Sequence, residues 1–207
     1  MPSYKLYYFN GRGRAEPTRL MLAAAGLPYE DIRMEPEQWP EYKKKMPMGQ
    51  APVLEVDGRT MISQSIAIAR FVAKESGLAG KTNMEQARAD MMVDGFVDMV
   101  NKMADYVWYE PDEARKAEKK KTFFETTLPE FLGHFEKLLV ANNGGNGFFV
   151  GDGLTHAEVF FLGLSDDITA EKPDILSPHP KLAALVDRIR KYPGIQEWLA
   201  KRPQTPW

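Results

Sequence analysis

The sequence has no cysteine among its 207 residues. This absence excludes disulfides, a protein thiol nucleophile and any thiolate metal site. The three histidines, His134, His156 and His179, are scattered without the spacing of metal ligands, so no metal site is predicted. If thiol chemistry takes place on this protein, the sulfur therefore belongs to the substrate.

An excess of one charge and a long apolar run are also missing. The 27 basic and 29 acidic side chains give a formal net charge of −2, which provides no electrostatic footprint for DNA or RNA. No apolar run approaches the ~18 residues of a membrane span, and the N-terminus lacks the basic and apolar regions of a signal peptide. We therefore expect a cytosolic protein with neither a nucleic-acid nor a membrane partner.

The most informative stretch runs from Tyr4 to Glu16. Residues 4–9 form a short, aromatic-rich apolar run that is typical of a buried strand, and the Asn-Gly-Arg-Gly sequence that follows breaks it. A helix is then predicted to begin near Arg14. Two glycines of a dinucleotide-binding fingerprint are present, but Glu16 stands where the third should be, which excludes that motif.

Tyr8 and Arg14 are the candidate functional residues of this stretch. A tyrosine near the end of a strand, followed at once by a glycine turn and a helix start, brings a phenol and an arginine beside backbone N–H groups. This chemistry suits an anion, including a thiolate. The alternative is that Tyr8 is a core aromatic residue whose hydroxyl has found a partner, and the local sequence does not decide between the two.

Strand signals are concentrated in the first 77 residues. They alternate with helical patterns in the order βαβ and then ββα, and the second strand pair flanks the hairpin turn Asp57-Gly58. The strands of the βαβ unit are expected to be parallel, so the sequence predicts an α/β domain with a mixed four-stranded sheet. The predicted strands are 4–9, 29–34, 53–56 and 59–62, and the helices are 14–25 and 63–77.

Helical patterns replace strands in the second half of the chain. Residues 78–83 are interpreted as a linker and 84–207 as an all-helical domain. The apolar residues Met92, Phe96, Met99 and Met103 lie on one face of a long helix. Residues 123–140 repeat this pattern, with Pro129 as a candidate kink.

Local signals also place the last helices. Thr155–Glu158 has the form of a capping box that opens a strongly apolar, buried helix. Two further short helices are predicted over 181–192 and 194–201.

Taken in order along the whole chain, these segments resemble the glutathione S-transferases, specifically the sigma class, which includes prostaglandin D synthases and cephalopod lens S-crystallins. The resemblance implies a thioredoxin-like domain followed by an all-helical one, a homodimer, and detoxifying conjugation of glutathione to hydrophobic electrophiles without a metal. The motifs that carry it are Tyr8-Phe9 with Gly13-Arg14-Ala15-Glu16, Trp39-Pro-Glu-Tyr-Lys43, Pro52-Val53-Leu54, Gln64-Ser65 with Ala67-Ile68-Ala69-Arg70, Gly147-Phe-Phe-Val-Gly151, and Lys201-Arg202-Pro203.

The same resemblance implies a glutathione site. Tyr8 would donate a hydrogen bond to the sulfur and Arg14 would add positive potential, while Asp98 would reach across the dimer to the α-amino group. The remaining residues would hold the peptide backbone and its carboxylates: Trp39 and Lys43 the glycine carboxylate, Gln50 and Ala51 beside a cis-Pro52 the backbone, and Gln64 and Ser65 the γ-glutamyl carboxylate.

The electrophile site is less constrained by motif. The candidates are Phe9, Met103, Tyr106, Trp108 and Phe160, and a core position is the alternative for each. Asp98 also has an alternative, since Asp90, Asp94 and Asp98 recur every four residues as on a solvated helix face.

Three functions stay open at this point. The first is a conjugating enzyme, with or without isomerisation of prostaglandin H to prostaglandin D. The second is a structural lens crystallin derived from that enzyme, and the third is a storage protein for haem or other hydrophobic ligands. Family crystallins tend to lose groups at the thiolate site, whereas this sequence keeps them all, so the enzyme is favoured.

Overall fold

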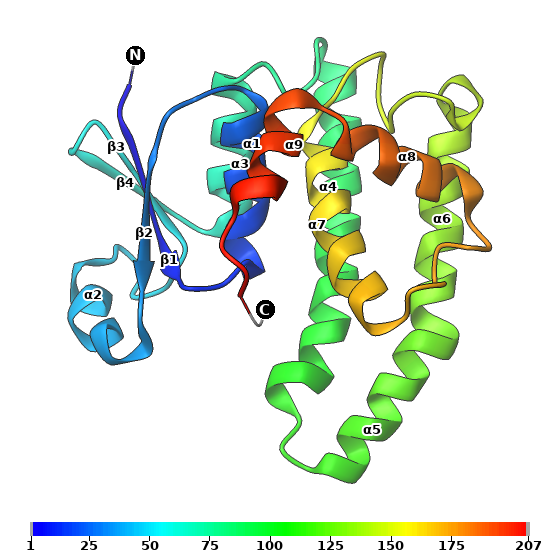
Figure 1. Ribbon diagram of the computed structural model, residues 1–207, viewed down its shortest axis with the longest axis horizontal. Helices are drawn as coiled ribbons and strands as arrows, with labels where there is room; N and C mark the ends of the chain where they lie inside the picture. Colours follow the sequence, from blue (N-terminus) through cyan, green and yellow to red (C-terminus); the bar gives the residue numbers. More distant parts are fainter. Residues whose placement is uncertain (1, 206–207) are drawn as a thin grey trace. The chain divides into compact units, whose positions relative to one another are not determined.

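The computed structural model of the protein describes residues 2–205, which form two compact units (Figure 1). One unit contains the residues up to Ala79 together with those from Arg190 onward, and the other is Gly80–Ile189. The sequence analysis ends the first domain at residue 77 and assigns all of 84–207 to the helical domain. In the structure the C-terminal helix α9 (Pro193–Lys201) instead packs against α1 (Glu16–Ala24) in the first unit.

A mixed four-stranded sheet forms the centre of the first unit, as predicted. Its strand order is β2-β1-β3-β4, with β1 parallel to β2 and antiparallel to β3, and with β3 and β4 forming the hairpin. The turn at Asp57 and Gly58 has positive φ at both residues, 55° and 64°, which is the backbone geometry of a tight hairpin turn. The strands are β1 (Tyr4–Phe9), β2 (Glu30–Met34), β3 (Val53–Val56) and β4 (Thr60–Ser63).

Helices cover both faces of this sheet. Figure 1 shows α1 and α3 (Ser65–Glu75) on one side and α2 (Trp39–Lys45) on the other. Along β1 every second side chain is buried, so that Tyr4, Leu6 and Tyr8 share one face of the strand. The face of β1 that carries Tyr8 is therefore the more deeply buried of its two faces.

The docking of α9 depends on a close approach and a buried carboxylate. A side chain at Gly194 would place its Cβ 2.0 Å from the carbonyl oxygen of Ala23, so only glycine fits there. Glu16, 3% exposed, accepts hydrogen bonds from Trp198 Nε1 at 2.9 Å and from Arg202 Nη1 at 3.0 Å. The C-terminal helix is thus held on α1 by close backbone packing at Gly194 and by hydrogen bonds to the Glu16 carboxylate.

We expect Gly194→Ala to destabilise the first unit by about 1–3 kcal/mol or more, because the new methyl group must push α9 away from the α1 backbone. Gly133→Ala is the matched control, since Gly133 is an exposed helical glycine with open space at its Cβ. That change should instead stabilise by up to about 1 kcal/mol. Urea and thermal unfolding measure both, and equal unfolding midpoints for the two variants would contradict the close packing.

The second unit is all helical. A cluster of aromatic rings lies in its core, where Phe96 packs against Phe135, Phe149 and Phe161 with centroid distances of 4.6, 5.6 and 5.6 Å. Its helices are α4 (Asn83–Ala104), α5 (Glu113–Thr122), α6 (Leu128–Ala141), α7 (His156–Glu171) and α8 (Pro180–Arg190). No helix within residues 2–205 combines the length and the hydropathy that a membrane span needs.

The predicted helix over 123–140 is α-helical only from Leu128 onward. Residues Phe123–Thr127 form a π-helical turn that joins α5 to α6, and Pro129 lies in the first turn of α6. Proline is tolerated there because the first N–H groups of a helix have no intrahelical acceptor. The irregularity therefore lies before Pro129, in the π-helical turn.

The capping box before α7 is present as predicted. The Glu158 carboxylate accepts hydrogen bonds from the N–H of Thr155 at 2.7 Å and from the N–H of Phe149 at 2.6 Å. It also accepts the hydroxyl of Thr155, and the side chain is fully buried. Burial raises the pKa of Glu158 to about 7, against the opposing effect of these donors.

This titration predicts a pH dependence of stability. An ordinary glutamate titrates near 4.5, so between pH 4.5 and about 7 the folded protein binds a proton that the unfolded chain has lost. The free energy of unfolding should therefore fall as pH rises through this window, by at most about 3 kcal/mol. Urea titrations of the parent and of Glu158→Gln at several pH values test this. The glutamine variant should lack that part of the slope, and parallel profiles would contradict the assignment.

Candidate functional site

Tyr8 lies near the carboxyl end of β1, with its hydroxyl against the turn that follows. The side chain is 7% exposed, and its Oη accepts the backbone N–H of Arg14 at 3.2 Å. Gly13 has φ of 38°, and a Cβ at this residue would lie 2.7 Å from the Tyr8 hydroxyl. The glycine is thus required both by the backbone and by the close approach of the phenol.

Burial and the neighbouring charges together determine the protonation state of Tyr8. Burial raises the pKa of the phenol above its usual value, and the N–H of Arg14 and the cations of Arg14 and Arg19 lower it only in part. Tyr8 is therefore a neutral phenol at physiological pH. Its oxygen accepts from the backbone, and the phenol keeps its own proton.

Trp39 and Lys43 lie one turn apart at the start and middle of α2. The ring of Trp39 packs on Phe9 at a centroid distance of 5.3 Å, and Phe9 in turn packs on Tyr8 at 5.8 Å. The stem of Lys43 lies beside Gly49, whose added Cβ would be 3.6 Å from the lysine Cε. An aromatic ring therefore lies against the end of β1, and the exposed side chain of Lys43 follows it one turn later in α2.

The loop before β3 and the start of α3 are joined by side chains. Gln64 Nε2 donates to Gln50 Oε1 at 2.9 Å, and the Ala51–Pro52 peptide bond is cis. Gln64 has φ of 75° and precedes Ser65, the first residue of α3. The first N–H groups of an α-helix have no intrahelical acceptor and favour negative charge.

Nine of the ten predicted glutathione-binding residues lie in the first unit, where Tyr8 is bonded to Arg14 and Gln50 to Gln64. Asp98 belongs to the second unit, where it is exposed on α4. The acidic face on which it lies is partly engaged, because Asp90 contacts His156 Nε2 at 3.1 Å. The solvated-face alternative therefore does not hold for Asp90.

The candidates for the electrophile site differ widely in exposure. Trp108 is 64% exposed, whereas Tyr106 is 4% exposed and packs on Phe123, as a core residue does. Met103 and Phe160 are half-buried in the second unit, and Phe9 is half-buried in the first. Exposure thus favours Trp108 over Tyr106 as a residue that a ligand could touch.

Sequence reasoning missed Arg19. Its side chain is fully buried in α1, and its Nη1 donates to the carbonyl of Gly11 at 2.7 Å. The available signal was an arginine that directly precedes the apolar run Leu20-Met21-Leu22 of a predicted helix. As for metals, residues 2–205 contain no group of three or more acidic or histidine side chains placed to hold an ion.

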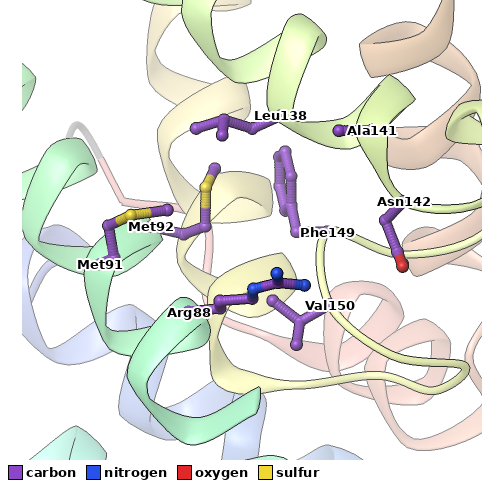
Figure 2. Close-up of a pocket in the computed structure, with 8 residues that line it drawn as sticks. All are labelled: Arg88, Met91, Met92, Leu138, Ala141, Asn142, Phe149 and Val150. Carbon is purple, nitrogen blue, oxygen red and sulfur yellow. The ribbon is translucent and has the colours of Figure 1, made fainter. Parts of the chain in front are cut away.

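A pocket of about 190 Å³ lies between α4 and α6 in the second unit (Figure 2). It is mostly apolar, with Met92, Leu138 and Phe149 around it and the guanidinium of Arg88 at one side. None of the predicted site residues lines it. The remaining lining residues are Met91, Ala141, Asn142 and Val150.

Comparisons with known proteins agree with the fold. The N-terminal domain model of glutathione S-transferase matches residues 4–74, and the C-terminal domain model matches 97–202. S-crystallin SL11 of Nototodarus sloanii is 41% identical over 207 residues, and hematopoietic prostaglandin D synthase of Gallus gallus is 42% identical over 205 residues, each match covering 99% of both chains. The solved structure of rat hPGDS complexed with a quinoline has a TM-score of 0.89 and 36% identity, covering 99% of this chain and 100% of that one.

Proposed function

Because this chain belongs to the glutathione S-transferase family, we propose that it is a cytosolic enzyme that joins the thiolate of glutathione to hydrophobic electrophiles. The observation that carries the proposal is the neutral, buried phenol of Tyr8, whose oxygen is held by the N–H of Arg14 in the turn after β1. Glutathione is its co-substrate. The cytosol supports this chemistry because glutathione is kept reduced there.

The mechanism follows from the reference pKa of a thiol. A cysteine thiol has a pKa of ~8.5, so stabilisation of the thiolate by about 1.4 kcal/mol lowers that value by one unit. The Tyr8 hydroxyl would donate to the sulfur, and Arg14, exposed at the same turn, adds positive potential. The thiol proton leaves to solvent. The thiolate then forms a sulfur–carbon bond at the electrophilic carbon, while the leaving group departs to solvent with the electron pair of its own bond to that carbon.

The rest of the site would hold the tripeptide. Trp39 and the ammonium of Lys43 suit the glycine carboxylate, and the first turn of α3 suits the γ-glutamyl carboxylate through Gln64 and Ser65. The strand-like backbone of Gln50 and Ala51, next to Pro52, would pair with the cysteinyl backbone. These contacts are equal in the ground state and the transition state, so they set affinity and not turnover.

We expect Tyr8→Phe to lower kcat about 10²-fold with little change in glutathione affinity, because the lost hydroxyl acts on the thiolate and not on the tripeptide backbone. Tyr7→Phe is the matched control: Tyr7 is the neighbouring phenol of β1 and donates to Glu55 at 3.0 Å, away from the site. A chromogenic conjugation assay and a glutathione titration measure both. Parental turnover in Tyr8→Phe across a pH series would remove Tyr8 from the mechanism.

We also propose that the enzyme is a homodimer in which Asp98 contacts the α-amino group of glutathione bound to the other subunit. What supports this is the exposure of Asp98 on α4, where its carboxylate could accept a charge-assisted hydrogen bond from an ammonium group. Each glutathione site would then be completed by the neighbouring chain.

Asp98→Asn should raise the KM for glutathione about tenfold, the loss expected for one charge-assisted hydrogen bond, with little change in kcat. Asp94→Asn, one turn earlier on α4, is the control and should keep the parental KM. Analytical ultracentrifugation should show an intact dimer in both. A parental KM for Asp98→Asn, or a stable monomer with full affinity, would exclude the cross-subunit contact.

Isomerisation of prostaglandin H to prostaglandin D is a second candidate activity, favoured by the 42% identity to the Gallus gallus synthase. Incubation of the protein with prostaglandin H, with and without glutathione, tests it directly.

A structural role as a crystallin is the alternative from another class, supported by the 41% identity to an S-crystallin. Retention on a glutathione-affinity column together with conjugating activity would decide for the enzyme.

A further inference from the structure

Arg19 is a buried cation whose position packing alone does not explain. Its side chain has no exposed area, and the residues that follow it in α1, Leu20 to Leu22, belong to the core. A buried ion pair seldom gains stability over an apolar side chain of similar size, because both charges lose their hydration. A role for the guanidinium other than packing therefore has to be sought in what it touches.

Arg19 holds the turn that follows β1. Its Nη1 donates to the carbonyl of Gly11 at 2.7 Å and lies 3.4 Å from the carbonyl of Arg12. Because a trans peptide group is planar, fixing these two carbonyls also fixes the N–H groups of Arg12 and Gly13, and so the backbone that leads directly to Arg14. The N–H of Arg14, in the same turn, is the one that meets Tyr8 Oη at 3.2 Å.

The same guanidinium lies against the ring of Tyr8. Its Cζ is 5.9 Å from the ring centroid, within the range of a cation–π interaction. Its second terminal nitrogen, Nη2, is buried and finds no hydrogen-bond acceptor among residues 2–205. The positive charge of the guanidinium lowers the pKa of the Tyr8 phenol, against the larger effect of burial.

Two carboxylates hold Arg19 in place. Asp31 of β2 accepts from Nε at 3.1 Å, and Glu16, one turn earlier in α1, accepts from Nη1 at 3.3 Å. The guanidinium is thus fixed from the strand and from its own helix. The other charged or titratable groups that face this cluster are Arg33 on Asp31 at 2.9 Å, Arg202 on Glu16 at 3.0 Å, Arg14 and the phenol of Tyr29.

We propose that Arg19 is a positioning residue for the thiolate chemistry: through the Gly11–Arg12 carbonyls and the Tyr8 ring it holds the phenol in the direction of the glutathione sulfur. This inference rests on the proposed function, and it assigns Arg19 no contact with glutathione. It predicts that a change at Arg19 alters the ionisation of the bound thiol and the turnover, and leaves the affinity for the tripeptide close to that of the parent.

The test uses Arg19→Lys, which keeps the charge and loses the planar fork that reaches the turn and Asp31 together. The pH dependence of kcat at saturating glutathione reports the thiol pKa in the complex. We expect that pKa to rise by about one unit and kcat at neutral pH to fall about tenfold, with a nearly unchanged KM for glutathione. Arg33→Lys is the matched control, because the Arg33 side chain shares Asp31 and its Nη1 donates to the side chain of Asn10 instead of to the turn carbonyls.

The outcomes separate this inference from the proposed function. A parent whose kcat shows no thiol titration below pH 8.5 would overturn the proposed function and the inference with it. A normal parental titration that is unchanged in Arg19→Lys would overturn the role of Arg19 alone, and so would a raised KM with parental kcat and thiol pKa. If urea unfolding shows that Arg19→Lys is unfolded, Asp31→Asn takes its place, with a smaller rise of the thiol pKa expected and an unchanged value contradicting the inference.

Discussion

The proposed chemistry of this protein depends on one contact, the hydrogen bond from the N–H of Arg14 to the oxygen of Tyr8. It exists because the chain turns at Gly13 with positive φ and because no side chain at that residue blocks the phenol. Burial keeps the phenol protonated, and the backbone donor fixes its oxygen. A strand, a glycine turn and a helix start, thirteen residues of sequence in all, therefore position a neutral phenol, which we propose as the hydrogen-bond donor to the glutathione sulfur.

A buried charge cluster supports this turn from behind. Glu16 accepts from Arg19, Trp198 and Arg202, so that the first helix of the chain and the residues around α9 share one carboxylate. Desolvated charges of this kind are strongly destabilising when one partner is removed, because the remaining charge stays buried. The cluster thus ties the geometry of the turn to the packing of the C-terminal helix within the same unit.

Much of the fold could be predicted because its signals are local. Short apolar runs and the Asp-Gly turn predicted the four strands correctly, and Thr155–Glu158 predicted the capping box. Helix α5 was not predicted, because Glu113–Thr122 carries no apolar stripe and buries none of its residues. Its start depends on the side chain of Asp112, which accepts the N–H of Arg115 at 2.9 Å.

The candidate site also has a part that local sequence signals predict and a part that they do not. Tyr8, Arg14 and the start of α3 could be found from motifs, since each lies at the end of a strand or the beginning of a helix. The contacts of Arg19 could not be predicted, because its partners Asp31 and Gly11 come together only when β2 pairs with β1. Trp198 and Arg202 lie 182 and 186 residues from Glu16, a separation over which periodicity and spacing carry no information.

The most direct test of the central claim is an ultraviolet difference titration of the thiolate in the complex of the parental protein with glutathione. The account predicts that the bound thiol ionises clearly below the ~8.5 of a free cysteine-like thiol, so that the thiolate is already present at neutral pH. It also predicts that Tyr8 contributes no tyrosinate absorption in that range, since burial raises its pKa. A bound thiol that titrates like the free one, or a tyrosinate signal from Tyr8 near neutral pH, would contradict it.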